Sequence, residues 1–490
     1  MERRAQFDNQ NLHRYPMVVA AVLFMAGVAL FDVVTLPWWA LWGGLILCTV
    51  GAALMLQSRI ANLYIAAALI LFGGAIVSLR GFTPRIPTEK RLYLALDIED
   101  NPVIRKGFAV VPARISEYER DGVMSCVDER VNLYVDTLVK VDFGNRIEAL
   151  GRVLPFPEKF GSYGRLMSRR GFVGTVFLRA EDIVKVEKIE RQTLHSVVVE
   201  RLARLGLSGD VATVVGAMAV GDLSGMTSEL REAYARSGAS HILAVSGLHV
   251  GIIFLLFNLL LVWLPLLRHG QIVRAVLVVV PIWLYAAMCG FSPSVVRAAV
   301  MFSALQAAVA SSSRYVSLNV LAATAFAMLI YRPDYLFDIS FQLSFLAVLA
   351  ILVWGVPIMS GLRSGRVWLD AIMATVVVGA VSSVATMPLV AHNFGTVSLV
   401  GILLNPLVIL CAYVIVILAV VWIVLPFAPL AGVFGGALSF AGEVLNRAVG
   451  AVAQWEWSAV EISLPSWAVW TIYGIAVAIT ALARCFETKK

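Results

Sequence analysis

The densest group of chemically capable side chains lies in residues 237–251, SGASHILAVSGLHVG, inside an otherwise apolar stretch. His241, Ser246 and His249 could form a serine–histidine nucleophile pair, a two-histidine metal site or the polar lining of a helix bundle. Ser246 lacks a G-x-S-x-G elbow and has no acid nearby. His241 and His249 lie about 80° apart around a helix, which suits a shared metal poorly. We favour helix packing or pore lining, and hydrolysis remains an alternative.

Three further segments place polar groups within apolar runs, where they are costly unless they face a cavity or another helix. Arg297 lies about one turn into a predicted span and either meets an acid or a passing anion such as phosphate, or extends to the interface. Gln342 and Ser344 follow the helix-breaking Pro333, which indicates a re-entrant element. Asn405 precedes Pro406 in an apolar run and can cap the backbone groups that the proline frees.

These segments must be held by elements embedded in a membrane. The chain has 490 residues, of which 60% are hydrophobic and 14% are charged, whereas soluble proteins average about 25% charged residues. This composition excludes a cytosolic enzyme, a disordered regulator and a disulfide scaffold. The apolar residues come in long blocks, which predicts a polytopic α-helical membrane protein.

The hydropathy predicts about twelve spans, with re-entrant or interfacial helices at 191–245. The spans are expected at about 17–36, 38–56, 61–79, 246–267, 275–290, 293–312, 316–331, 343–359, 368–389, 398–425, 430–452 and 466–483. Arginines and lysines in alternate loops place both termini in the cytoplasm. Residues 1–79 therefore form an N-terminal group of spans, and residues 246–490 form the main transmembrane domain.

The polar residues are concentrated in an insert between the third and fourth spans. Residues 80–206 hold 22 Lys and Arg and 18 Asp and Glu, more than half of all the charges in the chain. Three crossings before the insert place it outside the cytoplasm. About five short apolar or alternating runs, separated by turn signals, predict a small β-barrel such as an OB-fold at 80–190. A small sandwich or meander fits the same pattern.

The four polar segments, in this order, resemble the competence domain of the ComEC family, inner-membrane DNA-uptake channel proteins of competent bacteria. Gly221-Asp222 and then residues 237–249 follow the family pattern S-G-x-x-H-x-L-A-x-S-G-L-H closely. Arg297-Ala298, the FQLSF of 341–345 and Asn405-Pro406 match its later elements. Residues 160–171, FGSYGRLMSRRG, are similar to the segment that ends the family's N-terminal OB-fold domain.

The resemblance implies a channel that translocates single-stranded transforming DNA into the cytoplasm. The channel-lining residues that we expect are His241, Ser246, His249, Arg297, Gln342, Ser344 and Asn405. In the outer domain, aromatic and basic residues suit single-stranded DNA, or else form a linker at the membrane surface. These are Lys159, Phe160, Tyr163, Arg165, Arg169 and Arg170, with Tyr134 and Phe143 as further stacking candidates.

The sequence departs from many family members in one respect, because none of its six histidines lies in the H-x-H-x-D-H arrangement of their nuclease domain. We therefore expect no catalytic residues, no metal and no cofactor. A DNA receptor, a cytoplasmic helicase-type motor and a nuclease are expected as separate partners, beside single-stranded DNA and membrane lipid. The alternatives are a transporter of another polyanionic or small solute, or an intramembrane hydrolase that uses Ser246 and His249.

Overall fold

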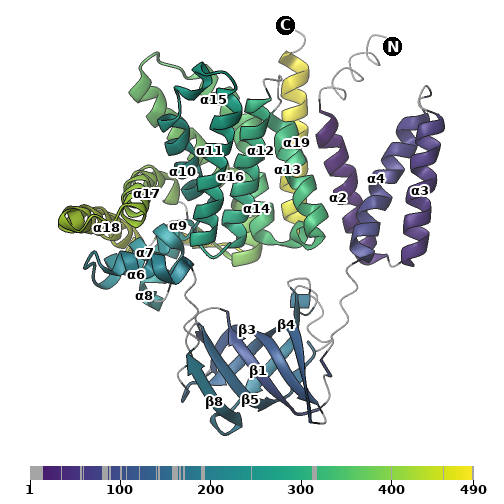
Figure 1. Cartoon of the computed structure of the whole chain (residues 1–490). Helices are drawn as coiled ribbons and strands as arrows, with labels where there is room; N and C mark the ends of the chain where they lie inside the picture. Colours follow the sequence, from purple (N-terminus) through teal and green to yellow (C-terminus); the bar gives the residue numbers. More distant parts are fainter. Residues whose placement is uncertain are drawn as a thin grey trace. The chain divides into compact units, whose positions relative to one another are not determined.

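The chain folds into two compact units. The computed structural model describes residues 15–34, 36–55, 58, 60–79, 86–87, 90–99, 102–105, 108–120, 122–139, 141, 144–156, 164, 167–168, 171–188, 194–223, 225–243, 245–311, 317–398, 400–455 and 457–487. One unit comprises residues 24–193 and 332–337, and the other comprises the rest of the chain. Figure 1 shows helices and a separate β-sheet, as the segregation of charge in the sequence predicts.

Three apolar helices precede the sheet: α2 (Pro16–Val33), α3 (Trp38–Leu54) and α4 (Ile60–Ser78). Small residues let α2 and α4 approach closely. A Cβ atom added at Gly27 would lie 2.1 Å from the Ile70 carbonyl oxygen, and one at Gly73 would lie 2.6 Å from that of Phe24. Association through such small-residue contacts is typical of helices in lipid, where packing replaces the hydrophobic effect.

The insert is an eight-stranded sheet with the order β6-β7-β4-β3-β1-β5-β8, in which β2 also pairs with β3. The strands are β1 (Leu92–Ile98), β2 (Val103–Arg105), β3 (Phe108–Arg120), β4 (Val123–Asp136), β5 (Asn145–Gly151), β6 (Val153–Leu154), β7 (Phe172–Leu178) and β8 (Ile183–Lys188), with the short helix η2 (Ala180–Asp182) before β8. The pairing of β4 with β7 is parallel and the other pairings are antiparallel.

The prediction of about five strands was incomplete, because it missed β1 and β2. Strand β1 is central, since it pairs with both β3 and β5. Its signal was the row of apolar residues Leu92, Leu94, Leu96 and Ile98, which point to one face and are all buried. Gly122, at φ +80°, lies immediately before β4.

Strands β5 and β6 are separated only by Arg152, yet they lie at opposite parts of the strand order. Strand β5 pairs with β1, whereas β6 pairs with β7. A Cβ atom added at Gly151 would lie 3.1 Å from a methyl group of Leu178 on β7 and 3.3 Å from one of Leu94 on β1. The β5–β6 segment thus connects two parts of the sheet that are distant in the strand order.

The second unit is helical. It contains α6 (Leu194–Ala203), α7 (Gly209–Val220), α8 (Ser228–Arg236), α9 (Ser240–Leu243), α10 (Gly247–Leu260), η3 (Leu264–Leu266), α11 (Gly270–Met288), α12 (Pro293–Ala310), α13 (Ser317–Tyr331), α14 (Ile339–Ala350), η5 (Ile351–Gly355), α15 (Val356–Gly361), α16 (Val367–Phe394), α17 (Gly401–Val424), η6 (Ala428–Leu430), α18 (Ala431–Ala453) and α19 (Ser466–Glu487). Strands β9 (Thr396–Ser398) and β10 (Ala459–Glu461) pair antiparallel. The short helix η4 (Pro333–Phe337) belongs to the first unit.

The chain is a polytopic membrane protein. Within the described residues, eight helices are long and apolar enough to cross a membrane, and α3, α10, α13 and α19 add shorter apolar segments. Each predicted span contains a helix, although the span expected at 343–359 is divided into α14, the π-helical turn η5 and α15. Figure 1 views α17 and α18 nearly end-on while α11 and α12 stand upright, so the helices are not parallel rods.

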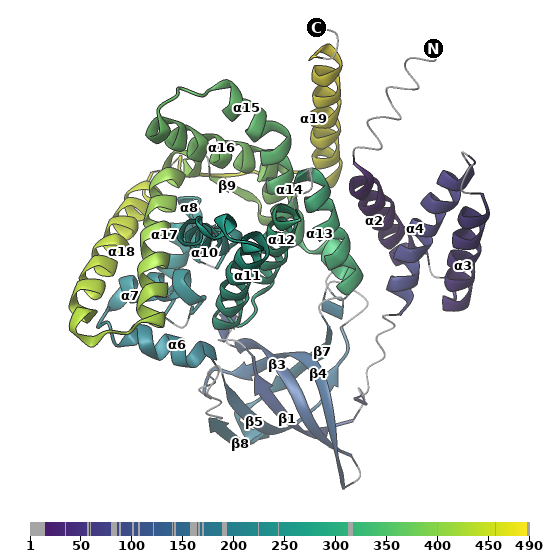
Figure 2. The same ribbon diagram turned by 45° about the horizontal axis from the view of Figure 1, so that its top comes forward.

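The short helices between residues 194 and 243 pack onto the helical unit to different depths. Helix α7 is largely buried, whereas most residues of α6 and α8 are exposed or half-buried, and Figure 2 shows α6 at the edge of the unit. The last seven residues of α7 are almost all buried, in a core shared with α17 and α18. The Tyr285 hydroxyl donates a hydrogen bond to the Ala219 carbonyl over 2.9 Å, and Arg201 donates to the Ile423 carbonyl over 2.6 Å. These bonds satisfy carbonyl groups near the ends of α7 and α17.

Strand β6 approaches β7 too closely for a side chain at position 174. A Cβ atom there would lie 2.3 Å from the Leu154 carbonyl oxygen. We expect Gly174→Ala to destabilise the sheet by about 1–3 kcal/mol, the usual cost of overpacking. Hydrogen exchange of residues 145–178 in the full-length protein measures the effect. The neighbouring substitution Thr175→Ala should leave exchange close to wild type, and equal exchange in both variants would contradict the close approach.

Candidate functional site

Ser246 and His249 form a reciprocal cap at the start of α10. Ser246 is the N-cap residue, and its hydroxyl oxygen accepts a hydrogen bond from the Leu248 backbone N–H at 3.2 Å. In return, His249 Nδ1 accepts a hydrogen bond from the Ser246 backbone N–H at 2.9 Å, and it also lies 2.9 Å from the Ser246 hydroxyl oxygen. This is a capping box in which histidine replaces the usual glutamate. We call it the Ser246–His249 cap.

The cap determines which nitrogen of His249 carries the proton. Because Nδ1 accepts a backbone hydrogen bond, the neutral ring must be protonated at Nε2. The His249 side chain is fully buried, and its Nε2 has no hydrogen-bond partner among the described residues. A buried donor without a partner costs about 1–3 kcal/mol. The cap therefore presents an N–H donor that is suited to an acceptor such as water or an anionic oxygen.

Arg297 lies on the neighbouring helix. A Cβ atom added at Gly247 would lie 3.7 Å from the Ala298 methyl group, and one added at Gly251 would lie 3.3 Å from the Phe302 ring. From the first contact to the second, the position advances by four residues along both helices. Helices α10 and α12 therefore run parallel, and their N-termini lie at the same end. Arg297 is only 3% exposed. Two helix N-termini and a buried guanidinium make this end electropositive.

The first half of the Ser237–Gly251 segment contacts the loop before α17. Gly238 has φ +78°, and a Cβ atom there would lie 2.8 Å from the Ser398 hydroxyl oxygen and 3.0 Å from the Gly401 α-carbon. Ser398 in turn donates a hydrogen bond to the Ser458 carbonyl over 2.9 Å. The structure therefore brings together the first and fourth polar segments of the sequence through backbone contact.

The other expected lining residues are more dispersed. His241 is exposed on α9, where its Nδ1 lies 3.1 Å from the Gly238 carbonyl oxygen. Gln342 and Ser344 are half-buried on α14, after the Asp338 N-cap, and α14 contacts both α12 and α16. Asn405 lies in the second turn of α17, facing α16 at Gly379. These residues are linked to the Ser246–His249 cap through helix packing.

All six residues of the insert that we expected to bind DNA fall outside the described part of the chain, as does Phe143. They are Lys159, Phe160, Tyr163, Arg165, Arg169 and Arg170. Tyr134 is described, and it stacks on Phe177 with ring centroids 4.7 Å apart. Phe108 meets the same ring edge-on at 6.4 Å. Sequence reasoning missed Phe108 and Phe177, although all three occupy outward positions of the alternating strands β3, β4 and β7.

We call Phe108, Tyr134 and Phe177 the aromatic face. Phe177 is 49% exposed and Phe108 is 36% exposed. Several arginines of the sheet are ion-paired by contrast: Arg114 and Arg130 both bind Glu99 over 2.6 Å, and Arg146 binds Asp97 over 2.7 Å. The hydrogen bond to Asp97 raises the pKa of Arg146 above its usual value. The aromatic face is thus able to bind planar rings, while these arginines are occupied within the protein.

The helical unit matches a known family. Residues 218–486, more than half of the chain, match the family model described as "Competence protein". The chain belongs to the competence protein family. The matched region begins in α7 and includes the Ser246–His249 cap, the α10–α12 pair and the loop before α17, so it contains all four polar segments. It does not include the sheet.

Two curated relatives extend the comparison. The chain is 28% identical over 203 residues to ComE operon protein 3 of Bacillus subtilis, which covers 41% of this chain and 25% of that protein. It is 28% identical over 258 residues to an uncharacterized protein of Aquifex aeolicus, covering 52% of this chain and 57% of that protein. The chain thus spans less than two thirds of either relative. No solved structure matches.

Substitutions of Ser246 distinguish a capping role of this residue from a nucleophilic role. Ser246→Asn keeps a side-chain oxygen that can cap α10, whereas Ser246→Ala removes it and should cost about 1 kcal/mol of stability. We expect Ser246→Asn to retain DNA uptake in a transformable host and Ser246→Ala to reduce the melting temperature of the purified protein. Loss of all function in Ser246→Asn, with normal folding, would instead support a nucleophilic serine.

Proposed function

We propose that this protein is an inner-membrane channel through which single-stranded transforming DNA enters the cytoplasm. The observation that carries the proposal is the parallel α10–α12 pair of a competence-family chain. At one end it holds two helix N-termini, the buried Arg297 and the His249 Nε2–H donor, which no described residue binds. Each of these groups favours an anionic oxygen. A phosphate backbone that crosses the membrane needs such groups, spaced so that no single one holds it permanently.

The topology that we propose has twelve spans and both termini in the cytoplasm. It rests on the presence of a helix at each predicted span. Three helices precede the sheet, and an odd number of crossings would put the sheet on the opposite side from the N-terminus. We further propose that the sheet closes into a small OB-type barrel. The continuity of β5 into β6 and the parallel pairing of β4 with β7 support closure.

The aromatic face is the stacking surface that we propose for single-stranded DNA outside the membrane. Every base offers a π-face, so stacking on Tyr134, Phe177 and Phe108 would tolerate any sequence. The phosphate contacts would come from the basic residues of 159–170, because Arg114, Arg130 and Arg146 are engaged by carboxylates. In this scheme, bases and phosphates are bound by different parts of the insert.

Two alternatives use the same site differently. A transporter for another polyanion or a small solute would also use the electropositive end of α10 and α12. A hydrolase would use the 2.9 Å approach of the Ser246 hydroxyl oxygen to His249 Nδ1. The backbone N–H that already occupies Nδ1 explains this approach as capping, so we favour transport. A DNA receptor, a cytoplasmic helicase-type motor and a nuclease are the separate partners that we propose.

In a naturally transformable host, deletion of the gene should abolish the entry of DNA into the cytoplasm and leave DNA capture at the surface intact. Arg297→Gln should reproduce the defect, and Arg297→Lys should restore part of the uptake because it retains the charge. Fluorescent and radiolabelled DNA distinguish capture from entry, and immunoblots check protein levels. Arg268→Gln, at an exposed loop position, is the matched control. Normal transformation in the deletion strain would reject the proposed channel.

The aromatic face and the basic segment should affect DNA binding differently. Phe177→Ala should weaken binding of a labelled oligonucleotide to the full-length protein by about tenfold, the equivalent of one lost stacking contact, with an unchanged salt slope. Arg169→Gln combined with Arg170→Gln should flatten the dependence of log Kd on log salt. Leu138→Ala, at a position that is 83% exposed, is the control. Unchanged binding by Phe177→Ala would remove the role of the aromatic face.

A further inference from the structure

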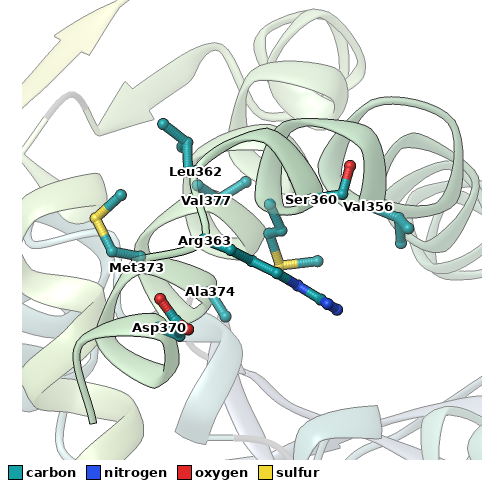
Figure 3. Close-up of a pocket in the computed structure, with 9 residues that line it drawn as sticks. Val356, Ser360, Leu362, Arg363, Asp370, Met373, Ala374 and Val377 are labelled. Atoms are coloured by element: carbon teal, nitrogen blue, oxygen red, sulfur yellow. The ribbon is translucent and has the colours of Figure 1, made fainter. Parts of the chain in front are cut away.

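A cavity opens between α15 and α16. Its volume is about 270 Å³. It is lined by Val356, Met359, Ser360, Leu362, Arg363, Asp370, Met373, Ala374 and Val377, eight of which are labelled in Figure 3. Six of these nine residues are apolar, so the walls offer few hydrogen bonds to a polar solute. The lining suits a hydrocarbon chain, with polar groups near the loop end only.

Arg363 is available to bind a ligand. Its guanidinium makes no hydrogen bond or ion pair within the described part of the chain, and Figure 3 shows it pointing away from Asp370. The Asp370 Oδ1 atom instead accepts hydrogen bonds from the Ser364 backbone N–H at 2.8 Å and from its hydroxyl at 2.7 Å. The loop 362–366 contains two arginines and no acidic residue. The polar end of the cavity therefore holds the cation Arg363, which interacts electrostatically with Asp370 but forms no hydrogen bond or ion pair with it.

In the topology proposed above, the cavity would lie where lipid headgroups and acyl chains meet. Residues 339–361 and 367–394 are both candidate membrane spans, so the loop that joins them lies at the membrane boundary if both cross. From the start of α16 to Val377 the helix rises about 15 Å, roughly half of the hydrocarbon thickness. The apolar lining thus extends from the headgroup level into the acyl region, with Arg363 at its outer end.

A local irregularity separates α15 from the preceding helix. The π-helical turn η5 inserts between α14 and α15, immediately before Val356. Trp354 in this turn donates a hydrogen bond to the Thr480 hydroxyl of α19 over 2.9 Å. Single π-turns inside helices are frequent at functional sites. The turn makes α15 a separate helix, and residues of α15 form one wall of the cavity.

We propose that this cavity binds one molecule of an anionic glycerophospholipid, with its phosphate on Arg363 and one acyl chain along Met359, Met373 and Val377. The volume is just below the range of about 300–1,000 Å³ that encloses whole drug-sized ligands, so it accommodates part of a lipid. An anionic headgroup is favoured over a zwitterionic one because the cationic group of a zwitterionic headgroup would be repelled by Arg363. Basic pockets between membrane helices bind anionic lipids in this way.

The test measures lipid binding to the purified full-length protein in detergent. Native mass spectrometry and thermal unfolding are recorded with dioleoyl-phosphatidylglycerol, with dioleoyl-phosphatidylcholine and with inorganic phosphate. We expect phosphatidylglycerol to be retained and to raise the melting temperature more than either alternative. Arg363→Gln should weaken its binding about tenfold, consistent with the loss of a charge-assisted hydrogen bond. Arg366→Gln, in the same loop but outside the lining, should weaken it less than twofold.

A second variant addresses the acyl chain independently of the charge. Ala374→Leu places three more carbon atoms in the cavity and should reduce retention while Arg363 stays in place. Equal effects of the two arginine substitutions would overturn the proposal in favour of general surface charge. Equal shifts with inorganic phosphate or phosphatidylcholine would overturn it as well, as would undiminished retention by Ala374→Leu. None of these results depends on DNA transport, so they leave the proposed channel untouched.

Discussion

Backbone groups that lie at membrane depth must find their hydrogen bonds inside the protein, because hydrocarbon offers none. The helical unit contains several helices too short to cross a membrane, and each one exposes unpaired carbonyl and N–H groups at its ends. Contacts with other helices satisfy such groups here: Tyr285 of α11 donates a hydrogen bond to the Ala219 carbonyl near the end of α7, and Arg201 of α6 donates one to the Ile423 carbonyl near the end of α17. Gly238 lies against Ser398 and Gly401 because no side chain separates them. The proposed translocation site depends on this packing.

The same constraint gives the Ser246–His249 cap two roles. The cap satisfies the first turn of α10 with side chains, which allows the helix to begin in the protein interior. Because the cap uses Nδ1 for this purpose, the buried Nε2–H group is left without a hydrogen-bond partner in the part of the chain that the structure describes. A structural requirement therefore creates a polar group that can act on an anion. The buried Arg297 on the parallel helix α12 adds positive charge at the same end.

Hydropathy and alternation were sufficient to predict where the elements lie, because burial in lipid and in the sheet imposes strong periodicities. A helix occupies each expected span, and the segment expected to be β-rich contains the sheet. The π-turn at 351–355 was not predicted, because the hydropathy of a span does not distinguish a π-turn from a continuous α-helix. The sequence also did not predict the aromatic face, because Phe177 meets Tyr134 only through the parallel register of β4 and β7. The spacing of the residues alone did not decide whether Ser246 is a nucleophile or a packing residue. Its hydrogen bonds in the structure identify it as the N-cap of α10.

The burial of α7 has a consequence for how the chain matures. Residues 92–188 contain every strand of the large sheet, so that sheet can assemble as soon as this segment has left the ribosome. Helix α7, by contrast, packs against α17 and α18, which are synthesised much later. Until residues 401–453 emerge, the core-facing side of α7 must be shielded by lipid or by the insertion machinery. Premature truncation of translation would thus produce a folded sheet attached to an unfinished helical unit.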